Sequence, residues 1–347
     1  MIINKEGIMK NNINETVTFD DVLLVPQYSE IMSRKTIDIS SNLSDDMPLE
    51  LPIISSPMDT ITDFSMATAM SANGGLGIIH RYNTIYEQSL SAKMVASEPK
   101  AAAIGASGDY LERAVELVDN GVKILCIDVA HGHHVLVRHA IKTLRNTFGT
   151  AIHIMAGNVA TLEGFNALAD WGADSVRVGV GGGSICSTRI QTGHGVPTLQ
   201  SIMECSRSDR SARIIADGGM KTSGDIVKAL AAGADFVMLG SMLAGTIETP
   251  GEAFYKDGIR YKSYRGMASV EAQMNWRGHY SSEEGVSHAV PQRGAVRNEL
   301  KSIANGIRSG LSYSGALNLK EFRSKSKFIK QTPAGQYESD THIKKRY

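Results

Sequence analysis

The chain has 347 residues, and 42% of them are apolar, which is enough for a large core in one barrel-sized domain. Lys plus Arg and Asp plus Glu both number 36, so bulk charge gives no reason to expect nucleic acid or an anionic membrane as a partner. The three cysteines, an N-terminus without a signal-like apolar core and the lack of any apolar run of about eighteen residues predict a cytoplasmic protein without disulfides or membrane spans.

Eight short apolar segments follow a polar N-terminal stretch, residues 1–16. They show no clean alternation, which is typical of parallel strands buried on both faces. The predicted strands are 51–55, 76–80, 101–105, 123–128, 151–156, 175–179, 212–217 and 235–239. Stretches with helical spacing separate most of them, and four of these stretches end on a glycine, a usual helix stop. The pattern predicts an α/β fold, a (β/α)8 TIM barrel, rather than an open doubly wound sheet.

Residues 246–294 interrupt the pattern after the eighth strand with a polar, glycine-rich stretch. A long excursion from the catalytic face of a barrel is more often a lid than an accident, so we expect an active-site flap. Residues 298–322 have helical spacing and would pack back on the barrel, and the polar residues 329–347 predict a flexible tail. No linker divides the chain, so residues 1–347 are expected to form a single catalytic domain.

Polar residues and glycines stand at or just past the C-terminal ends of the predicted strands. Barrels of this class build their active sites on the face formed by these ends. The residues that share this position are Ser55, His80, Asp128, Asn158, Gly181–Gly183, Asp217, Gly240 and Ser241. Gly218–Gly219 and Gly240–Ser241 follow the last two strands, where such barrels commonly bind phosphate.

Cys186 follows the triplet Gly181–Gly183 closely, in the stretch SVRVGVGGGSICSTRIQTGHGVP. Glycines let a backbone approach a ligand, and a cysteine just after such a turn is placed to act as a nucleophile. A half-buried, inert thiol is the alternative, because free cysteine is usually a small core residue.

Other motifs give weaker evidence of function. The run HGHH, His131–His134, together with His153, suggests zinc, but its spacing lacks the usual carboxylate or thiolate partners. No GxGxxG opens a helix after the first strand and no GxxxxGK[ST] occurs, so neither a Rossmann site nor a P-loop is expected. The aromatic residues are too scattered for a nucleic-acid surface.

Several segments together resemble the IMP dehydrogenase/GMP reductase family. They are TFDDVLLVP, SSPMDT, GGLGIIHR, AGNVAT, VGVGGGSICSTR, IADGG, GADFVMLGSMLAG and KSYRGM, and they occur in order from about Thr18 to the tail. The resemblance implies a barrel, usually a homotetramer, that acts on a purine 5′-monophosphate with a nicotinamide cofactor.

The resemblance also implies site residues. Cys186 would attack C2 of the purine. The phosphate cradle would comprise Ser184, Gly219, Gly240, Ser241 and Tyr264, with Asp217 and Asn158 at the ribose. Met58, Gly266 and Met267 would frame the base, and Ser55 is added as a substrate residue. Asp128, with Ala130 beside it, would bind the cofactor ribose, and carbonyls of Gly181, Gly183 and Cys186 would hold a monovalent cation such as K⁺.

The direction of the reaction is the harder question. Residues 105–123 leave room for one helix only, so the CBS module usual in dehydrogenases is expected to be absent. The flap contains Arg277 and Tyr280, but not as the adjacent water-activating pair of dehydrogenases, whereas SSPMDT, SMLAGT and AGQYESDTHI look more like a dehydrogenase. We expect NADPH-dependent reduction of GMP to IMP, with Thr188 and Glu284 relaying the proton to the leaving ammonia. The alternatives are oxidation of IMP to XMP with NAD and a catalytically silent nucleotide-binding barrel.

Overall fold

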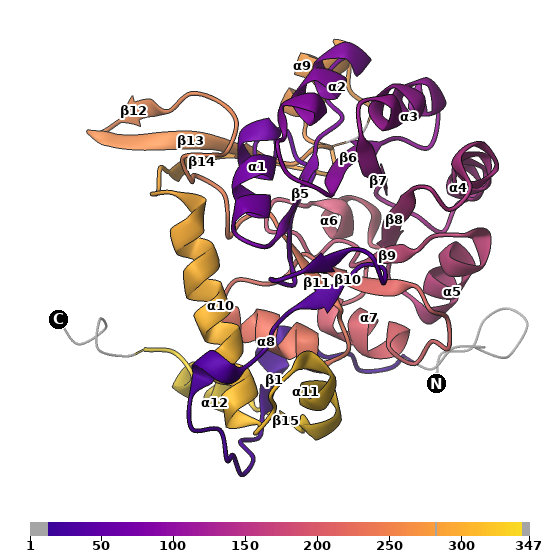
Figure 1. Cartoon of the computed structure of the whole chain (residues 1–347). Helices are drawn as coiled ribbons and strands as arrows, with labels where there is room; N and C mark the ends of the chain where they lie inside the picture. Colours follow the sequence, from indigo (N-terminus) through magenta and orange to yellow (C-terminus); the bar gives the residue numbers. More distant parts are fainter. Residues whose placement is uncertain (1–12, 282, 342–347) are drawn as a thin grey trace, which may run out of the picture.

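The computed structural model describes residues 13–281 and 283–341, and its centre is a closed barrel of parallel strands (Figure 1). Around the barrel the strand order is β10-β11-β4-β5-β6-β7-β8-β9. The barrel strands are β4 (Ile53–Ser55), β5 (Leu76–Ile79), β6 (Lys100–Ile104), β7 (Val122–Asp128), β8 (His153–Val159), β9 (Ser175–Val178), β10 (Arg213–Asp217) and β11 (Phe236–Leu239). All eight predicted strands are therefore confirmed, and the fold is a TIM barrel.

Helices cover the outside of the barrel. They are α1 (Phe64–Ala72), α2 (Ile85–Met94), α3 (Tyr110–Asp119), α4 (Val135–Phe148), α5 (Leu162–Trp171), α7 (Thr198–Cys205), α8 (Ser223–Ala231) and α10 (Val296–Tyr313), with the short helix α11 (Leu319–Lys325). The short helix α6 (Thr188–Thr192) instead lies in the segment after β9. Local chemistry sets their ends: Thr222 and Asp225 form a capping box at the start of α8, and Gly172 ends α5 at a φ of +116°.

Two apolar layers explain why the strand segments lack alternation. Inside the barrel, side chains such as Ile124, Met155 and Phe236 are fully buried against one another. A small hairpin, β2 (Ser41–Asn42) and β3 (Pro48–Leu49), adds the buried Leu43 and Leu49 to the same cluster. The opposite faces of the strands pack against the helices, so both faces are apolar.

The excursion 246–294 has two parts. The antiparallel sheet of β12 (Phe254–Lys256), β13 (Ile259–Arg265) and β14 (Ser287–Pro291) projects from one side of the barrel (Figure 1). The helix α9 (Val270–Arg277) instead lies close to α2 and α3 in the same view. The excursion is less solvated than its polar composition suggests, since Lys262 is buried and donates to the carbonyl groups of Ile247 and Thr249.

The expectation of a flexible tail over 329–347 needs correction, because regular structure continues to Glu338. β15 (Phe328–Lys330) pairs antiparallel with β1 (Val22–Leu24), and α12 (Pro333–Glu338) follows. The polar sequence hides this order because backbone hydrogen bonds to β1 hold the segment. The terminal residues 1–12 and 342–347 lie outside the described part.

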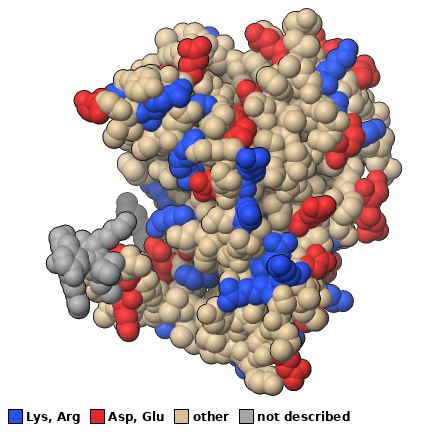
Figure 2. Space-filling view, turned by 60° about the vertical axis from the view of Figure 1, so that its left-hand side comes forward, with Lys and Arg blue, Asp and Glu red and all other residues tan. Residues whose placement is uncertain are grey.

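The surface carries both signs of charge. Figure 2 shows Lys and Arg side chains interspersed with Asp and Glu over one face, in keeping with a net charge of zero. Among the described residues, no helix is both long and apolar enough to cross a membrane.

Candidate active site

A cavity of about 790 Å³ opens at the C-terminal ends of the barrel strands, within the size range of ligand sites. It brings together all but one of the residues to which the sequence analysis gave a catalytic, substrate, cofactor or cation role. Those that line it are Met58, Asp128, Ala130, Asn158, Gly181, Gly183, Ser184, Cys186, Thr188, Asp217, Gly219, Gly240, Ser241, Tyr264, Gly266, Met267 and Glu284.

Ser55 is the exception. It is fully buried in β4, and its hydroxyl is 2.8 Å from the Thr62 hydroxyl. The next residue, Ser56, lines the cavity instead. The suggestion of Ser55 as a substrate residue is therefore corrected, because successive side chains of a strand point to opposite faces.

The loop after β9 places Cys186 beneath the flap. Gly181 has a φ of +75°, and a Cβ on Gly182 would lie 2.4 Å from the Thr198 hydroxyl, so the turn requires glycine. Cys186 Sγ is 3.2 Å from Thr188 Oγ1, and Thr188 Oγ1 donates to Glu284 Oε2 at 2.7 Å. Sulfur, hydroxyl and carboxylate thus form one hydrogen-bonded chain.

Backbone pairing holds Glu284 in this chain. Ser187 N donates to Glu284 O at 3.1 Å, and Val286 N donates to Ile185 O at 3.0 Å. The returning strand of the flap is therefore fastened directly to the cysteine loop, on both sides of Cys186.

A polar corner suited to phosphate lies beside the cysteine loop. Ser184 Oγ and the Tyr264 hydroxyl are 3.3 Å apart, and burial raises the pKa of Tyr264, which keeps it a neutral donor. A Cβ on Gly240 would lie 3.2 Å from the Tyr264 hydroxyl and 3.3 Å from Met58 Sδ. Glycine at that position keeps the corner open for a ligand.

A buried arginine, which the sequence analysis missed, forms the floor of the cavity. Arg177 in β9 is 6% exposed and pairs with both Asp128 and Asp217. Burial lowers the pKa of Arg177, but the two carboxylates outweigh this effect and hold the pKa well above the usual range. A charged residue inside an apolar strand was the available signal, because buried charges require partners.

Polar atoms of Asp217, Asn158 and Arg81 surround this floor. Asn158 Nδ2, at 2.8 Å, and the Arg177 guanidinium both donate to Asp217 Oδ2. Asn158 Oδ1 and Arg81 Nε are buried without a hydrogen-bond partner in the described structure, and both residues line the cavity. A buried polar group without a partner at a cavity wall is satisfied when a ligand binds. One acceptor and one donor beside two carboxylates suit the hydroxyl groups of a nucleotide ribose.

The wall of the cavity also includes residues beyond the phosphate corner and the cysteine loop. They come from the loops after β5, β6 and β7 and from α9, and they include Arg81, Tyr82, His131, His134 and Trp276. Within 13–281 and 283–341, no cluster of three or more His, Cys, Asp or Glu side chains could hold a metal ion. Desolvation lowers the pKa of His131, and the neighbouring histidines act in the same direction.

The flap does not assemble an arginine–tyrosine pair. Tyr280 is 51% exposed and is not part of the cavity wall. Arg277 lines the cavity, but its guanidinium donates to Gln273, Ser281 and the His279 carbonyl.

The structure is a TIM barrel whose cavity at the C-terminal ends of the strands includes the cysteine loop, and comparison with known proteins places the chain in one family. A sequence model of the IMP dehydrogenase / GMP reductase domain matches residues 16–342. An inosine-5′-monophosphate dehydrogenase of Nitrosopumilus maritimus is 33% identical over 468 residues, covering 94% of this chain and 98% of the relative. A GMP reductase of Leishmania major is 32% identical, covering 94% of this chain and 97% of the relative.

A solved structure gives the same result. The crystal structure of a GMP reductase variant from Trypanosoma brucei in complex with guanosine 5′-monophosphate matches with a TM-score of 0.89 and 30% identity. The match covers 95% of this chain and 98% of that one. The chain belongs to the IMP dehydrogenase/GMP reductase family of oxidoreductases, which use nicotinamide cofactors.

Proposed function

We propose that the chain catalyses the NADPH-dependent reductive deamination of GMP to IMP and ammonia. The observation that carries this is the Cys186–Thr188–Glu284 chain under the flap, together with a tyrosine, Tyr280, that stays outside the cavity. This chain of contacts supports delivery of a proton to a leaving amine, and the position of Tyr280 outside the cavity wall does not favour activation of water by an arginine–tyrosine pair.

The steps follow from the chemistry of these groups. Cys186 passes its proton through the Thr188 hydroxyl to Glu284, along the direction of the hydrogen bonds. The thiolate adds to C2 of the purine, while the phosphate lies at Ser184 and Tyr264. The 2-amino group cannot leave as an amide anion, so Glu284 returns the proton through Thr188, and ammonia departs. A reduced nicotinamide cofactor, when bound, supplies a hydride to C2. The C2–S bond then breaks, which releases IMP, and a proton from solvent restores the thiol.

Oxidation of IMP to XMP with NAD is the second candidate. Arg277 lines the cavity, and an inosine-5′-monophosphate dehydrogenase of Cryptosporidium parvum is 35% identical over 388 residues. In that reaction, Arg277 or Tyr280 would have to move to activate water.

A two-way assay decides between them. Purified protein is given GMP with NADPH, and separately IMP with NAD, and absorbance of the reduced cofactor is followed. The proposal expects oxidation of NADPH with release of ammonia, and production of XMP from IMP would contradict it.

The monovalent cation, the homotetramer and the cytoplasmic location stay predictions. One of the carbonyl groups predicted to bind the cation, that of Gly183, accepts a hydrogen bond from Cys186 N at 3.1 Å in this structure.

A further inference from the structure

Another cavity lies at the end of the barrel opposite to the active site. Its volume is about 460 Å³, within the size range of small-molecule sites. It opens between the N-terminal ends of β10 and β11 and the C-terminal ends of α7 and α8. Its wall includes three serines and three arginines, Ser206, Ser208, Ser211, Arg210, Arg213 and Arg323, together with a single carboxylate, that of Asp235.

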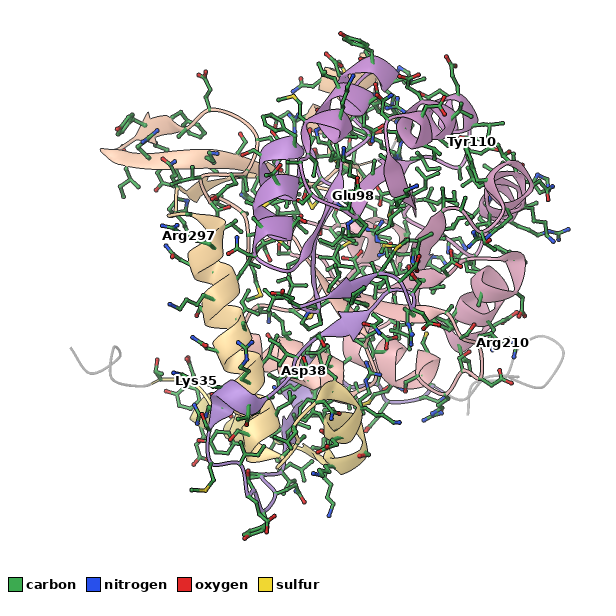
Figure 3. All side chains as sticks on the ribbon, in the orientation of Figure 1. Lys35, Asp38, Glu98, Tyr110, Arg210 and Arg297 are labelled. Carbon is green, nitrogen blue, oxygen red and sulfur yellow. The ribbon has the colours of Figure 1, made fainter. Side chains whose placement is uncertain are left out.

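This cavity is separate from the catalytic one. β10 begins at Arg213, which lines the cavity described here, and ends at Asp217, which lines the active site. The two cavities share no lining residue. Figure 3 labels Arg210 at the lower right, in the region where Figure 1 labels α5 and α7, and Tyr110 of α3 near the top. A ligand here would therefore not overlap the substrate.

Arg323 in α11 is held in place and still has a donor to offer. Its Nη2 donates to the Ala234 carbonyl at 2.7 Å and to Asp235 Oδ1 at 3.0 Å. The other oxygen of Asp235 accepts from Ile214 N at 2.8 Å, so this carboxylate is engaged on both sides. Arg323 Nε is buried and has no hydrogen-bond partner in the described structure. A buried donor of this kind at a cavity wall is satisfied when a ligand binds.

Arg213 is the second available cation. Its side chain is half-buried and makes no ion pair or hydrogen bond among residues 13–281 and 283–341. Arg210 differs, because its guanidinium is already paired with Asp170, at 2.9 Å, and with Asp209. The wall thus presents two guanidinium groups, those of Arg213 and Arg323, with donors that the protein leaves unused.

We propose that this cavity binds a small phosphate ester, with Arg213 and Arg323 as donors to its phosphate group. A guanidinium suits phosphate because it offers several charge-assisted N–H donors in a fixed plane. The serine-rich remainder of the wall suits the hydroxyl groups of a polar ester, and the volume leaves room for more than a phosphate ion. The site does not depend on the reaction proposed above.

Ribose 5-phosphate is a suitable probe, and calorimetry measures its dissociation constant. The protein is first saturated with IMP, a ligand of both candidate reactions, without a cofactor, so that the phosphate corner of the active site is filled. Wild type should bind ribose 5-phosphate saturably. Arg213→Gln should bind it about 10- to 100-fold more weakly, because one charge-assisted contact is lost. Unchanged IMP affinity would show that the variant is folded.

Two further variants separate the site from a general effect of charge. Ser211→Asp adds a negative charge to the wall without removing a hydrogen bond of the described structure, and it should weaken ribose 5-phosphate as well. Arg207→Gln is the matched control, since it removes an exposed arginine that lies near the cavity in sequence but does not line it. This control should bind as wild type does.

The outcomes decide the proposal without reference to the reaction. Absence of saturable binding by wild type, or equal affinity of wild type and Arg213→Gln, would overturn the site. Inorganic phosphate, titrated in the same way, should bind more weakly than ribose 5-phosphate. Tighter binding of the free ion would overturn the assignment to an ester. The two-way turnover assay tests the reaction separately.

Discussion

Cys186 differs from the other two cysteines in its surroundings. Burial raises the pKa of Cys126 and of Cys205 to about 12, and both side chains are fully enclosed. Cys186 is partly exposed to the cavity and faces Thr188. Only a thiolate that a substrate can reach acts as a nucleophile.

Replacement of Cys186 should therefore separate binding from chemistry. Cys186→Ala is expected to abolish turnover while GMP still binds, because the phosphate and ribose contacts do not involve the sulfur. Calorimetry with GMP and a turnover assay check this, with Cys205→Ala as the active control. Normal turnover by Cys186→Ala would exclude the covalent mechanism.

Tyr264 tests the phosphate corner. Tyr264→Phe removes one hydroxyl donor, which should raise KM for GMP about 10- to 100-fold, because a hydrogen bond to a charged group contributes about 1.5–3 kcal/mol. Steady-state kinetics with GMP and guanosine measure the effect, which should be absent for the nucleoside. An equal rise in KM for GMP and for guanosine would show that the Tyr264 hydroxyl does not contact the phosphate.

At the scale of elements, close packing of α1 on β5 depends on a missing side chain. A Cβ on Gly77 would lie 2.5 Å from the Ala67 backbone. Gly77→Ala should therefore lower the stability by about 1–3 kcal/mol, the usual range for overpacking. Thermal unfolding measures it, with Gly224→Ala as a control, because a Cβ there would lie 3.5 Å from the Thr222 hydroxyl, an ordinary van der Waals distance. Equal melting temperatures for the two variants would contradict the packing account.

Elements of the barrel were predictable from sequence, and those of the excursion were not. Short apolar runs such as 235–239 carry their own signal, because both faces are buried. β13 and β15 owe their structure to backbone pairing with distant segments, which leaves little trace in composition. Site residues at strand ends were predictable because the apolar runs show where each strand ends. The meeting of Trp276 with Arg81 and Tyr82 was not predictable, because Trp276 lies almost 200 positions further along the chain.

At the scale of the whole molecule, one buried histidine should set part of the acid sensitivity. His153 in β8 is 3% exposed, with Nε2 2.8 Å from the Ser175 hydroxyl, and burial lowers its pKa from 6.5 to about 4. The unfolded chain takes up this proton as the pH falls below 6.5, while the folded chain does so only near 4. Stability is therefore fully present above this window and falls through it, by roughly 2–3 kcal/mol.

Denaturant unfolding between pH 7 and about pH 4 measures this loss. The variant His153→Gln should show a flatter dependence on pH, because its side chain does not titrate. An identical pH dependence for wild type and variant would show that other groups control the acid limit.

Proton delivery by Glu284 is the central claim of the mechanism, and single-turnover release of ammonia from GMP tests it most directly. Glu284→Gln should slow this release about 10²- to 10⁴-fold, the usual range for loss of a general acid, with little change in GMP binding. Thr188→Ala should slow it too, whereas Glu283→Gln, a change in the adjacent exposed carboxylate, should leave it near wild type. Ammonia release at the wild-type rate from both Glu284→Gln and Thr188→Ala would contradict the account.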